Sequence, residues 1–353
     1  MKTIVLCDTP DQVLSAISFA YEEKEKGNYV DVLIDTLRCP NANMETIIHN
    51  LNNADIFSNV YKIKNLQEAK RSIKPVVKIF EWIFPALAYK VMTKGLNIEN
   101  YDALAVSGPF STQRCLIAAY PQKPLFYIED GLSSYTGRIG IRQLSWRGKI
   151  AQKLFKFGPE KIFPERCFVY RPGFYEGEYK DILQQFQFPI KKINSLNGVF
   201  GYDEIKIRDL YYGKRIVFLS QLARDNDYEE EKQETIKALM NYCSDKMIVR
   251  PHPRDNVKKM KGVTVDDSGT LWELICANNI TETSVLIGDC STAQFTPKLL
   301  FNTEPYLIIS MNEHDNSFAV PLIDRLKSLY INKDRLICVK NKEELLEAVR
   351  RII

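Results

Sequence analysis

Short apolar runs alternate with longer segments of helical periodicity along most of the chain. Runs of this length, rich in β-branched residues, predict buried strands rather than helices. In the first half they are Lys2–Cys7, Asp31–Asp35, Val60–Ile63, Ala103–Ser107 and Leu125–Ile128. The helical segments between them make the order βαβα, which predicts an open parallel sheet. Ligands bind such sheets outside the carboxyl ends of the strands.

A second series of the same kind fills the second half of the chain. Its predicted strands are Arg215–Leu219, Met247–Val249, Val263–Val265, Val285–Gly288, Tyr306–Ile309 and Leu336–Val339. Between the two series, residues 167–212 are aromatic and predict few regular elements, and we place the domain boundary near their end. The pattern therefore predicts two Rossmann-like α/β domains, residues 1–205 and 206–353, with parallel sheets facing a central cleft.

Composition narrows the class of protein. A chain of 353 residues suffices for about two domains, and 45% hydrophobic with 26% charged residues is typical of globular proteins. The net charge of +4 argues against a dedicated nucleic-acid binder. Asp8 ends the first apolar run too early for a signal peptide, and no apolar run approaches the roughly 20 residues that span a bilayer. Eight scattered cysteines without a CxxC pair indicate reduced thiols in a cytoplasmic protein.

The segment MIVRPHPR, which ends at Arg254, combines a short strand with a stiff basic loop. Pro251 and Pro253 restrict the backbone on either side of His252, and each lacks an N–H. The loop holds an imidazole between Arg250 and Arg254, which suits an anionic group and proton donation. An ordinary strand-end turn with solvated arginines explains the same residues equally well.

Two further groups follow in the second half. Ser291 and Thr292 stand at a predicted helix start, where hydroxyls and unpaired backbone N–H groups bind phosphate. Simple N-capping also accounts for them. Glu273 lies early in its helix and can accept hydrogen bonds from ribose hydroxyls, although a favourable interaction with the helix dipole is the simpler explanation.

In the first half, the sequence EDG at residues 129–131 follows a strand and offers a carboxylate as a general base. Adjacent side chains at a strand end point to opposite faces, so one of Glu129 and Asp130 faces the ligand side. We choose Asp130, which is next to a glycine; an acidic turn is the alternative. The loop from Asp8 to Pro10 follows another strand in the same way.

Asp225-Asn226-Asp227 spells the Asp-x-Asp that holds a metal–diphosphate in some glycosyltransferases. Acidic pairs at this spacing are common by chance, so the signal is weak. The sequence contains no P-loop, no Gly-x-Gly-x-x-Gly and no Cys/His cluster of zinc spacing.

The segment Arg138–Lys161 carries seven basic residues and one acidic residue. As a helix it places apolar side chains on one stripe with cations on both edges: Trp146, Ile150, Leu154 and Phe157, flanked by Arg147, Lys149, Lys153 and Lys156. This pattern suits an interfacial helix that contacts anionic lipid, and a core helix with a solvated basic face explains it equally well. Residues 75–92 are a weaker candidate for the same surface.

Three short motifs, taken together, resemble those of bacterial sialyltransferases. YIEDGLSSY resembles their acidic motif, RPHPR their His-Pro motif, and the Ser-Thr pair in LIGDCSTAQF their serine motif. The opening CDTPDQVLSAI, which contains Thr9, Pro10 and Gln12, is similar to the start of the lipooligosaccharide sialyltransferases and the capsular polysialyltransferases. The order and spacing of the motifs fit these families across nearly the whole chain.

This resemblance implies a GT-B fold, CMP-sialic acid as the donor, and inverting transfer without a metal or other cofactor. A carboxylate of Glu129 or Asp130 would be the base on the acceptor hydroxyl, and His252 the acid or phosphate partner. The implied donor-binding residues are Arg250, Pro253, Arg254, Glu273, Ser291 and Thr292. In the lipooligosaccharide enzymes an acidic residue after the first strand of the second domain has been proposed as base, which makes Asp225 and Asp227 the alternative.

The resulting hypothesis is a sialyltransferase that modifies a terminal galactose or sialic acid of a bacterial lipooligosaccharide or capsule at the cytoplasmic face of the membrane. Alternatives are a glycosyltransferase that uses CMP-Kdo or another nucleotide sugar, a sugar-nucleotide epimerase of the same architecture, and a non-enzymatic scaffold that binds nucleotide. The acceptor, the linkage, polymerisation and the oligomeric state stay open, with a homodimer among the alternatives.

Overall fold

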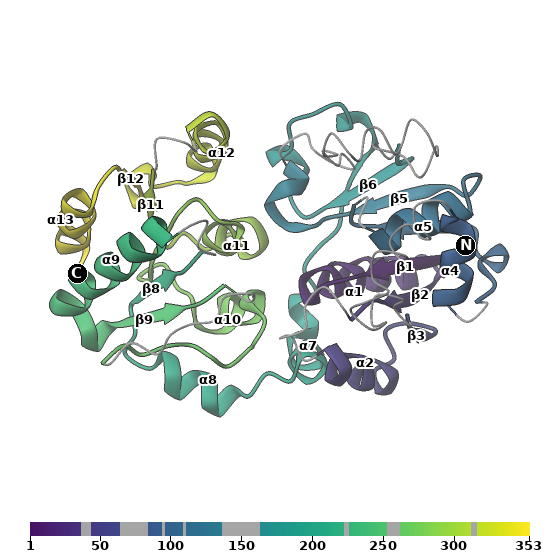
Figure 1. Cartoon of the computed structure of the whole chain (residues 1–353), viewed down its shortest axis with the longest axis horizontal. Coiled ribbons are helices and arrows are strands. Elements are labelled where there is room, and N and C mark those ends of the chain that lie inside the picture. Colours follow the sequence, from purple (N-terminus) through teal and green to yellow (C-terminus); the bar gives the residue numbers. More distant parts are fainter. Residues whose placement is uncertain are drawn as a thin grey trace. The chain divides into compact units, whose positions relative to one another are not determined.

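The computed structural model describes residues 1–36, 44–63, 84–93, 96–108, 111–135, 163–221, 226–252, 262–311 and 316–353. These residues form two compact units, Met1–Ser195 and Leu196–Ile353, each built on one parallel sheet (Figure 1). The division falls near the start of α7 (Ile193–Phe200), whereas the boundary predicted after residue 205 lies inside α8 (Glu204–Tyr211).

The sheet of the first unit has seven strands in the order β3-β2-β1-β4-β5-β6-β7. Their bounds are β1 Lys2–Cys7, β2 Tyr29–Ile34, β3 Val60–Lys62, β4 Ala103–Val106, β5 Leu125–Ile128, β6 Arg166–Val169 and β7 Leu183–Gln185. All pair in parallel, and the order reverses between β1 and β4, where Leu6 lies opposite Val106. This pair of strands is therefore the topological switch point, next to which ligands of such sheets bind.

The helices of the first unit are α1 Pro10–Glu25, α2 Met44–Asn53, α4 Pro85–Met92 and α5 Ser111–Ala119 within the described ranges. Helix α1 begins at Pro10, with Thr9 as its N-cap. The Thr9 side chain accepts a hydrogen bond from the Gln12 N–H at 3.4 Å. The start of the helix, and so the place of the loop after β1, is fixed by local sequence.

The prediction that residues 167–212 contain few regular elements is wrong. They hold most of β6, all of β7 and both α7 and α8. The apolar part of β6 is very short, yet Phe168 is buried against Phe19 of α1, with ring centroids 4.8 Å apart. β7 is an edge strand of sequence LQQ and lacks an apolar run altogether. Tertiary packing, rather than periodicity, makes these residues strands.

The second unit has five parallel strands in the order β12-β11-β10-β8-β9. Its elements are β8 Ile216–Leu219, α9 Asn226–Cys243, β9 Met247–Arg250, α10 Trp272–Asn279, β10 Val285–Gly288, α11 Thr292–Phe301, β11 Tyr306–Ser310, α12 Asn316–Leu329, β12 Leu336–Val339 and α13 Lys342–Ile352. Helix α12 was not predicted. Val265 forms an isolated parallel bridge to Val249 of β9. The switch point of this sheet lies between β8 and β10.

One face of the second sheet packs on α9 and α13. Leu239 of α9 and Val349 of α13 are fully buried in one cluster with Ile216, Met247 and Val285 of the strands. Strands covered on both faces have nearly continuous apolar sequences, as β8 and β10 do. The core therefore explains why the predictions of β8, β9, β10, β11 and β12 are accurate. The predicted strand Val263–Val265 is wrong, because of these three residues only Val265 pairs, in a single bridge.

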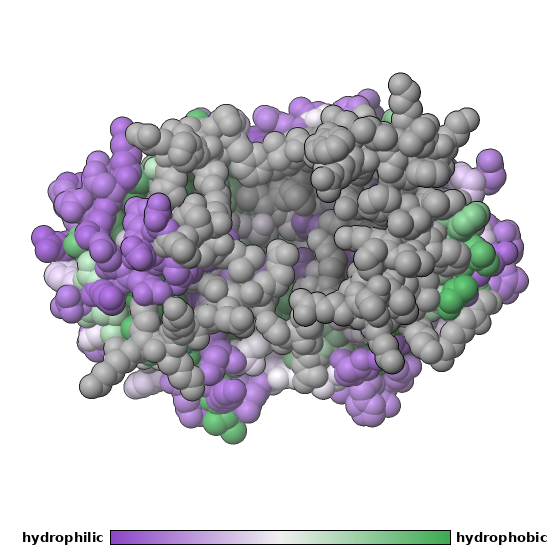
Figure 2. Space-filling model, in the orientation of Figure 1, coloured by the Kyte–Doolittle hydropathy of each residue, from purple (hydrophilic) through white to green (hydrophobic). Residues whose placement is uncertain are grey.

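Polar and apolar surfaces are distributed unevenly. Hydrophobic side chains gather on the surface around α4, where Leu87 and Val91 are about half exposed (Figure 2). In the described ranges, no helix combines the length and the hydropathy needed to cross a bilayer. The predicted basic segment Arg138–Lys161 and residues 75–83 lie outside the described residues.

Candidate functional site

Four carboxylates follow strands at the carboxyl edge of the first sheet. We call Asp8, Asp35, Glu129 and Asp130 the acidic edge; they follow β1, β2 and β5. Asp8, Asp35 and Glu129 are buried, whereas Asp130 is partly exposed. A carboxylate that a substrate can reach at this edge is therefore that of Asp130, in line with the alternation argument made from the sequence.

The Glu129 side chain forms hydrogen bonds inside the first unit. It accepts hydrogen bonds from the Tyr170 N–H at 2.7 Å and from the Tyr135 hydroxyl. Burial and the Glu129 charge raise the pKa of Tyr135 well above its ordinary value, so this hydroxyl stays a donor. Gly131 has φ of 62°, a conformation that favours glycine and turns the chain away from Asp130. Glu129 thus fixes the turn that presents its neighbour.

Gln12 brings the opening of the chain to Asp130. Its side chain is buried; Oε1 accepts from the Asp8 N–H at 2.7 Å, and Nε2 donates to Asp130 Oδ1 at 2.9 Å. Two predicted site residues that are 118 positions apart in the sequence are therefore in contact. Because the donor is a neutral amide, it orients the carboxylate without pairing it with a cation.

Helix α5 supports the other carboxylates in the same manner. Gln113 Oε1 accepts from the N–H groups of Ser107 and Gly108 at 3.0 and 2.9 Å, and its Nε2 donates to Asp8 Oδ2 at 3.2 Å. Thr112 donates to Asp35 Oδ2 at 2.6 Å. Burial, together with the charges of Asp8, Asp11 and Asp130, raises the pKa of the Cys7 thiol well above its ordinary value. The neighbouring carboxylates therefore make the potential at the Cys7 thiol more negative.

The second unit presents a different set of side chains at its carboxyl edge. We call Arg250, His252, Ser291 and Thr292 the His-Ser edge. Arg250 ends β9 and His252 follows it, whereas Ser291 is the N-cap and Thr292 the first residue of α11, which follows β10. Strand β8 lies between β9 and β10. Two strand spacings separate the loops, about 10 Å. His252 and Ser291 are partly exposed and Thr292 is exposed.

Hydrogen bonds of Gln294 connect the start of α11 to the preceding loop and to β11. Gln294 Oε1 accepts from the Ser291 N–H at 3.2 Å, and its Nε2 donates to the carbonyl of Ile308 at 3.0 Å. Cys290 has φ of 54°, an uncommon conformation for a residue other than glycine. Within the described part of the chain, Ser291 Oγ is buried and has no hydrogen-bond partner. A hydroxyl and a helix N-terminus together can bind an anion.

Arg250 is directed into the unit. Its guanidinium forms an ion pair with Asp266 and donates to the carbonyl of Thr270, and its side chain is 12% exposed. The Tyr211 hydroxyl donates to Asp266 Oδ2 at 2.7 Å. Burial alone would raise the pKa of Asp266, but the Arg250 charge and hydrogen bonds from Ser268 and Tyr211 lower it below its ordinary value. The described contacts of Arg250 therefore support the loop rather than a ligand.

The other predicted residues are less informative. Glu273 is partly exposed in the first turn of α10, and Asp227 is exposed in the first turn of α9. Asp225, Pro253 and Arg254 lie outside the described residues. Of the residues that are described, no three His, Cys, Asp or Glu side chains form a group that could hold a metal ion.

Sequence reasoning included Gln12 but missed Gln113, Gln294 and Asp266, which also build the two edges. Gln12, Gln113 and Gln294 each stand third in a helix, the position from which a glutamine reaches back to the preceding loop. That signal is legible in DTPDQ, SGPFSTQ and DCSTAQ. The sequence contains no comparable signal for Asp266, because its partner Arg250 belongs to a different element.

Comparison with known proteins identifies the family. A family model described as alpha-2,8-polysialyltransferase (POLYST) matches residues 3–308, a range that contains both edges. The chain belongs to the alpha-2,8-polysialyltransferase family. It is thus a glycosyltransferase of the sialyltransferase type, and the resemblance seen in the sequence motifs is confirmed. Among curated protein sequences, none matches the chain.

Solved structures confirm the predicted fold class. The co-structure of S. aureus MnaA with UDP has 14% identity and a TM-score of 0.57, covering 99% of this chain and 87% of that chain. Arabidopsis thaliana UGT89C1 complexed with UDP has 10% identity and a TM-score of 0.51, covering 99% and 90%. The glycosyltransferase VinC in complex with dTDP has 12% identity and a TM-score of 0.51, covering 100% and 91%. At this identity the likeness concerns the fold: two α/β units of the GT-B kind.

Proposed function

We propose that this polysialyltransferase-family protein transfers sialic acid from CMP-sialic acid to a terminal galactose or sialic acid of a bacterial surface glycan, in a lipooligosaccharide or capsule, with inversion at the anomeric carbon. The observation that carries the proposal is the family match over residues 3–308. The motifs within this range occupy the carboxyl edges of both sheets, where ligands of parallel α/β sheets bind.

In this proposal the acidic edge activates the acceptor. Asp130 is the partly exposed carboxylate of that edge, and Gln12 holds one of its oxygens at 2.9 Å. A charged, oriented carboxylate can take the proton from an acceptor hydroxyl as that oxygen attacks the anomeric carbon. Asp225 and Asp227 are the alternative base; Asp227 is exposed at the start of α9.

The His-Ser edge receives the leaving CMP. His252 is the proton donor or hydrogen-bond partner of the phosphate, and Ser291, Thr292 and the first N–H groups of α11 bind its oxygens. CMP leaves with one phosphate, so no diphosphate is formed that would need a chelating metal. We therefore expect transfer to persist in EDTA. Loss of transfer in EDTA that Mn²⁺ restores would instead make Asp225 and Asp227 metal ligands.

A peripheral position on the cytoplasmic face of the membrane is part of the proposal. The basic pattern of Arg138–Lys161 supports it, as do three side chains of about half exposure at helical spacing around α4: Phe84, Leu87 and Val91. Binding to anionic liposomes should weaken steeply with salt, because surface charges are screened beyond roughly 8 Å at physiological ionic strength. Binding that is unchanged when Lys149, Lys153 and Lys156 become Glu would reject this position.

Product analysis tests the transfer itself. Purified protein is incubated with CMP-sialic acid and a panel of galactosides and sialosides, and the products are separated and identified by mass and linkage. CMP-Kdo and UDP-sugars are run in parallel. Transfer from CMP-sialic acid alone supports the proposal. Transfer from CMP-Kdo would identify CMP-Kdo as the donor instead, and free sugar released from a UDP-sugar without an acceptor would indicate an epimerase.

A further inference from the structure

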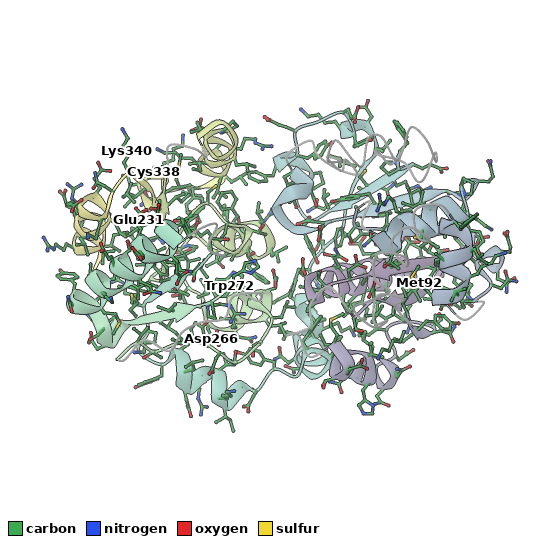
Figure 3. The ribbon with its side chains drawn as sticks, in the orientation of Figure 1. Met92, Glu231, Asp266, Trp272, Cys338 and Lys340 are labelled. Carbon is green, nitrogen blue, oxygen red and sulfur yellow. The ribbon has the colours of Figure 1, made fainter. Side chains whose placement is uncertain are left out.

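The two loops of the His-Ser edge share one buried support that neither motif contains. Trp272, the first residue of α10, is 7% exposed and is labelled in Figure 3. The Arg250 guanidinium lies over its ring, with Cζ 5.4 Å from the ring centroid. Its indole N–H donates to the carbonyl of Ala293 at 2.7 Å. One side chain thus contacts the His-Pro loop on one side and the first turn of α11 on the other.

The Arg250 side of this contact is itself held firmly. The guanidinium pairs with Asp266 and donates to the Thr270 carbonyl. The Asp266 carboxylate also accepts from the Tyr211 hydroxyl at 2.7 Å and from the Ser268 N–H at 3.1 Å. The planar guanidinium can stack on the indole while its N–H groups make these bonds. The position of Trp272 is therefore set by residues of α8, β9 and the loop that precedes α10.

The α11 side of the contact is the stretch that carries Ser291 and Thr292. Ala293 is the second residue of α11, and its carbonyl is the acceptor of the indole N–H. A hydrogen bond at this point restrains the first turn, whose N–H groups and hydroxyls would bind a phosphate. A shift of this turn relative to His252 would separate the two groups that act on one leaving phosphate.

We infer that Trp272 is a positioning residue that fixes the first turn of α11 relative to the Arg250–His252 loop, so that both loops act on the same nucleotide phosphate. The inference rests on the proposed nucleotide-binding role of this edge. Trp272 acts through Ala293 and Arg250, and no contact between its own ring and the donor is required.

The test compares two single hydrogen bonds at opposite ends of α10. Trp272→Phe removes the indole N–H, and Tyr202→Phe removes the bond from Tyr202 to Asn279 Oδ1, 2.9 Å long, at the last residue of the helix. If Trp272→Phe does not fold, β-(3-benzothienyl)alanine at position 272 replaces the N–H by sulfur and retains the ring volume. Each protein is studied by hydrogen exchange of peptides covering α11 and by calorimetric titration with CMP, UMP and UDP.

We expect Trp272→Phe to accelerate exchange in α11 and to raise the Kd of the bound nucleotide about 3- to 10-fold, the loss of one hydrogen bond. The donor KM should rise with it, and the acceptor KM should not. Tyr202→Phe should match the wild type in all of these. Equal exchange in both variants, or an unchanged Kd in Trp272→Phe, overturns the inference. If the wild type prefers UMP or UDP, CMP is refuted as the donor nucleotide, but the effect of Trp272→Phe on binding can still be measured. If no nucleotide binds, the hydrogen-exchange rates of α11 alone test the inference.

Discussion

At the acidic edge, the side-chain amide of Gln12 donates a hydrogen bond to the Asp130 carboxylate. At the His-Ser edge, the side-chain amide of Gln294 donates instead to the backbone carbonyl of Ile308. Both glutamines stand third in a helix that follows a strand, and both accept from an N–H of the preceding loop. The two units thus build the same strand–loop–helix turn. They differ in what the amide N–H group contacts: the Asp130 carboxylate in the first unit and the backbone of β11 in the second.

The electrostatic support of the two edges differs as well. In the first unit the Gln113 amide donates to Asp8 and the Thr112 hydroxyl donates to Asp35. Burial raises the pKa of Cys7, and the charges of Asp8, Asp11 and Asp130 raise it further. In the second unit the cation of Arg250 is paired with Asp266. In our proposal His252, the hydroxyls of Ser291 and Thr292 and the start of α11 bind the anion at that edge. We therefore propose that the first unit removes the acceptor proton and that the second unit binds the leaving phosphate.

The largest expected effects separate these two roles. His252→Ala should slow transfer by roughly 10²- to 10⁴-fold, as for a lost general acid. Asp130→Ala should lose transfer to a similar degree while CMP still binds, because the change removes the base and leaves the His-Ser edge intact. Steady-state rates and CMP titration of both variants measure this difference.

Two outcomes would break the assignment. Near-normal transfer by Asp130→Ala, with Asp225→Ala or Asp227→Ala inactive but able to bind CMP, would move the base to the second unit. Glu129→Gln serves as the matched control, since Glu129 accepts from Tyr135 and Tyr170 inside the fold. We expect it to lower stability and retain transfer; inactivity at normal stability would return the base role to Glu129.

The next largest effect concerns the ionic support of the second unit. Asp266 is fully buried, and Asp266→Asn leaves the Arg250 guanidinium without its counter-charge, which costs about 3–5 kcal/mol for a buried pair. Urea unfolding at pH 7 measures the loss. The exposed pair of Lys342 and Glu234 is the control, and Glu234→Gln should leave the midpoint nearly unchanged.

The same pair predicts a pH dependence. The pKa of Asp266 is lowered in the folded state, so its stabilisation is complete above the ordinary value of about 3.9 and is lost as the pH falls through the lower folded value. The gap in unfolding free energy between wild type and Asp266→Asn should therefore be constant from pH 7 to 5 and shrink below about pH 4. A gap that widens in acid would contradict the ion pair.

A smaller effect tests the glutamines directly. Gln12→Leu keeps the side-chain size and removes the bond to Asp130; we expect about a 10²-fold loss in kcat, since the base is no longer oriented, with the Kd of CMP unchanged. Gln294→Leu removes the bonds to Ser291 and Ile308 and should weaken CMP binding instead. If both variants change the same parameter, the division of roles between the units is wrong.

Much of this arrangement could be predicted from local sequence. Thr9 and Pro10 define a helix start through their own chemistry. The choice of Asp130, made because a glycine follows it, agrees with its partial exposure and with the burial of Glu129. Contacts between distant elements could not be predicted in this way. A sequence shows that Arg250 is basic, but not that Asp266 lies against it, and the prediction of Arg250 as a donor contact did not include that partner.

The smallest predicted effects come from two glycines of the second unit. A Cβ on Gly288 would lie 3.2 Å from the Leu219 carbonyl oxygen and 3.3 Å from Gln294 Oε1, so Gly288→Ala should destabilise by about 1–3 kcal/mol and loosen the Ser291 loop. Gly198 in α7 has open space at the same position, and Gly198→Ala should stabilise by about 0.5–1 kcal/mol. Thermal unfolding and CMP titration of both variants are the measurements. Since Gly288 packs against the glutamine that holds Ser291, only its variant should weaken CMP binding; an equal effect from Gly198→Ala would show that binding follows overall stability rather than the geometry of this edge.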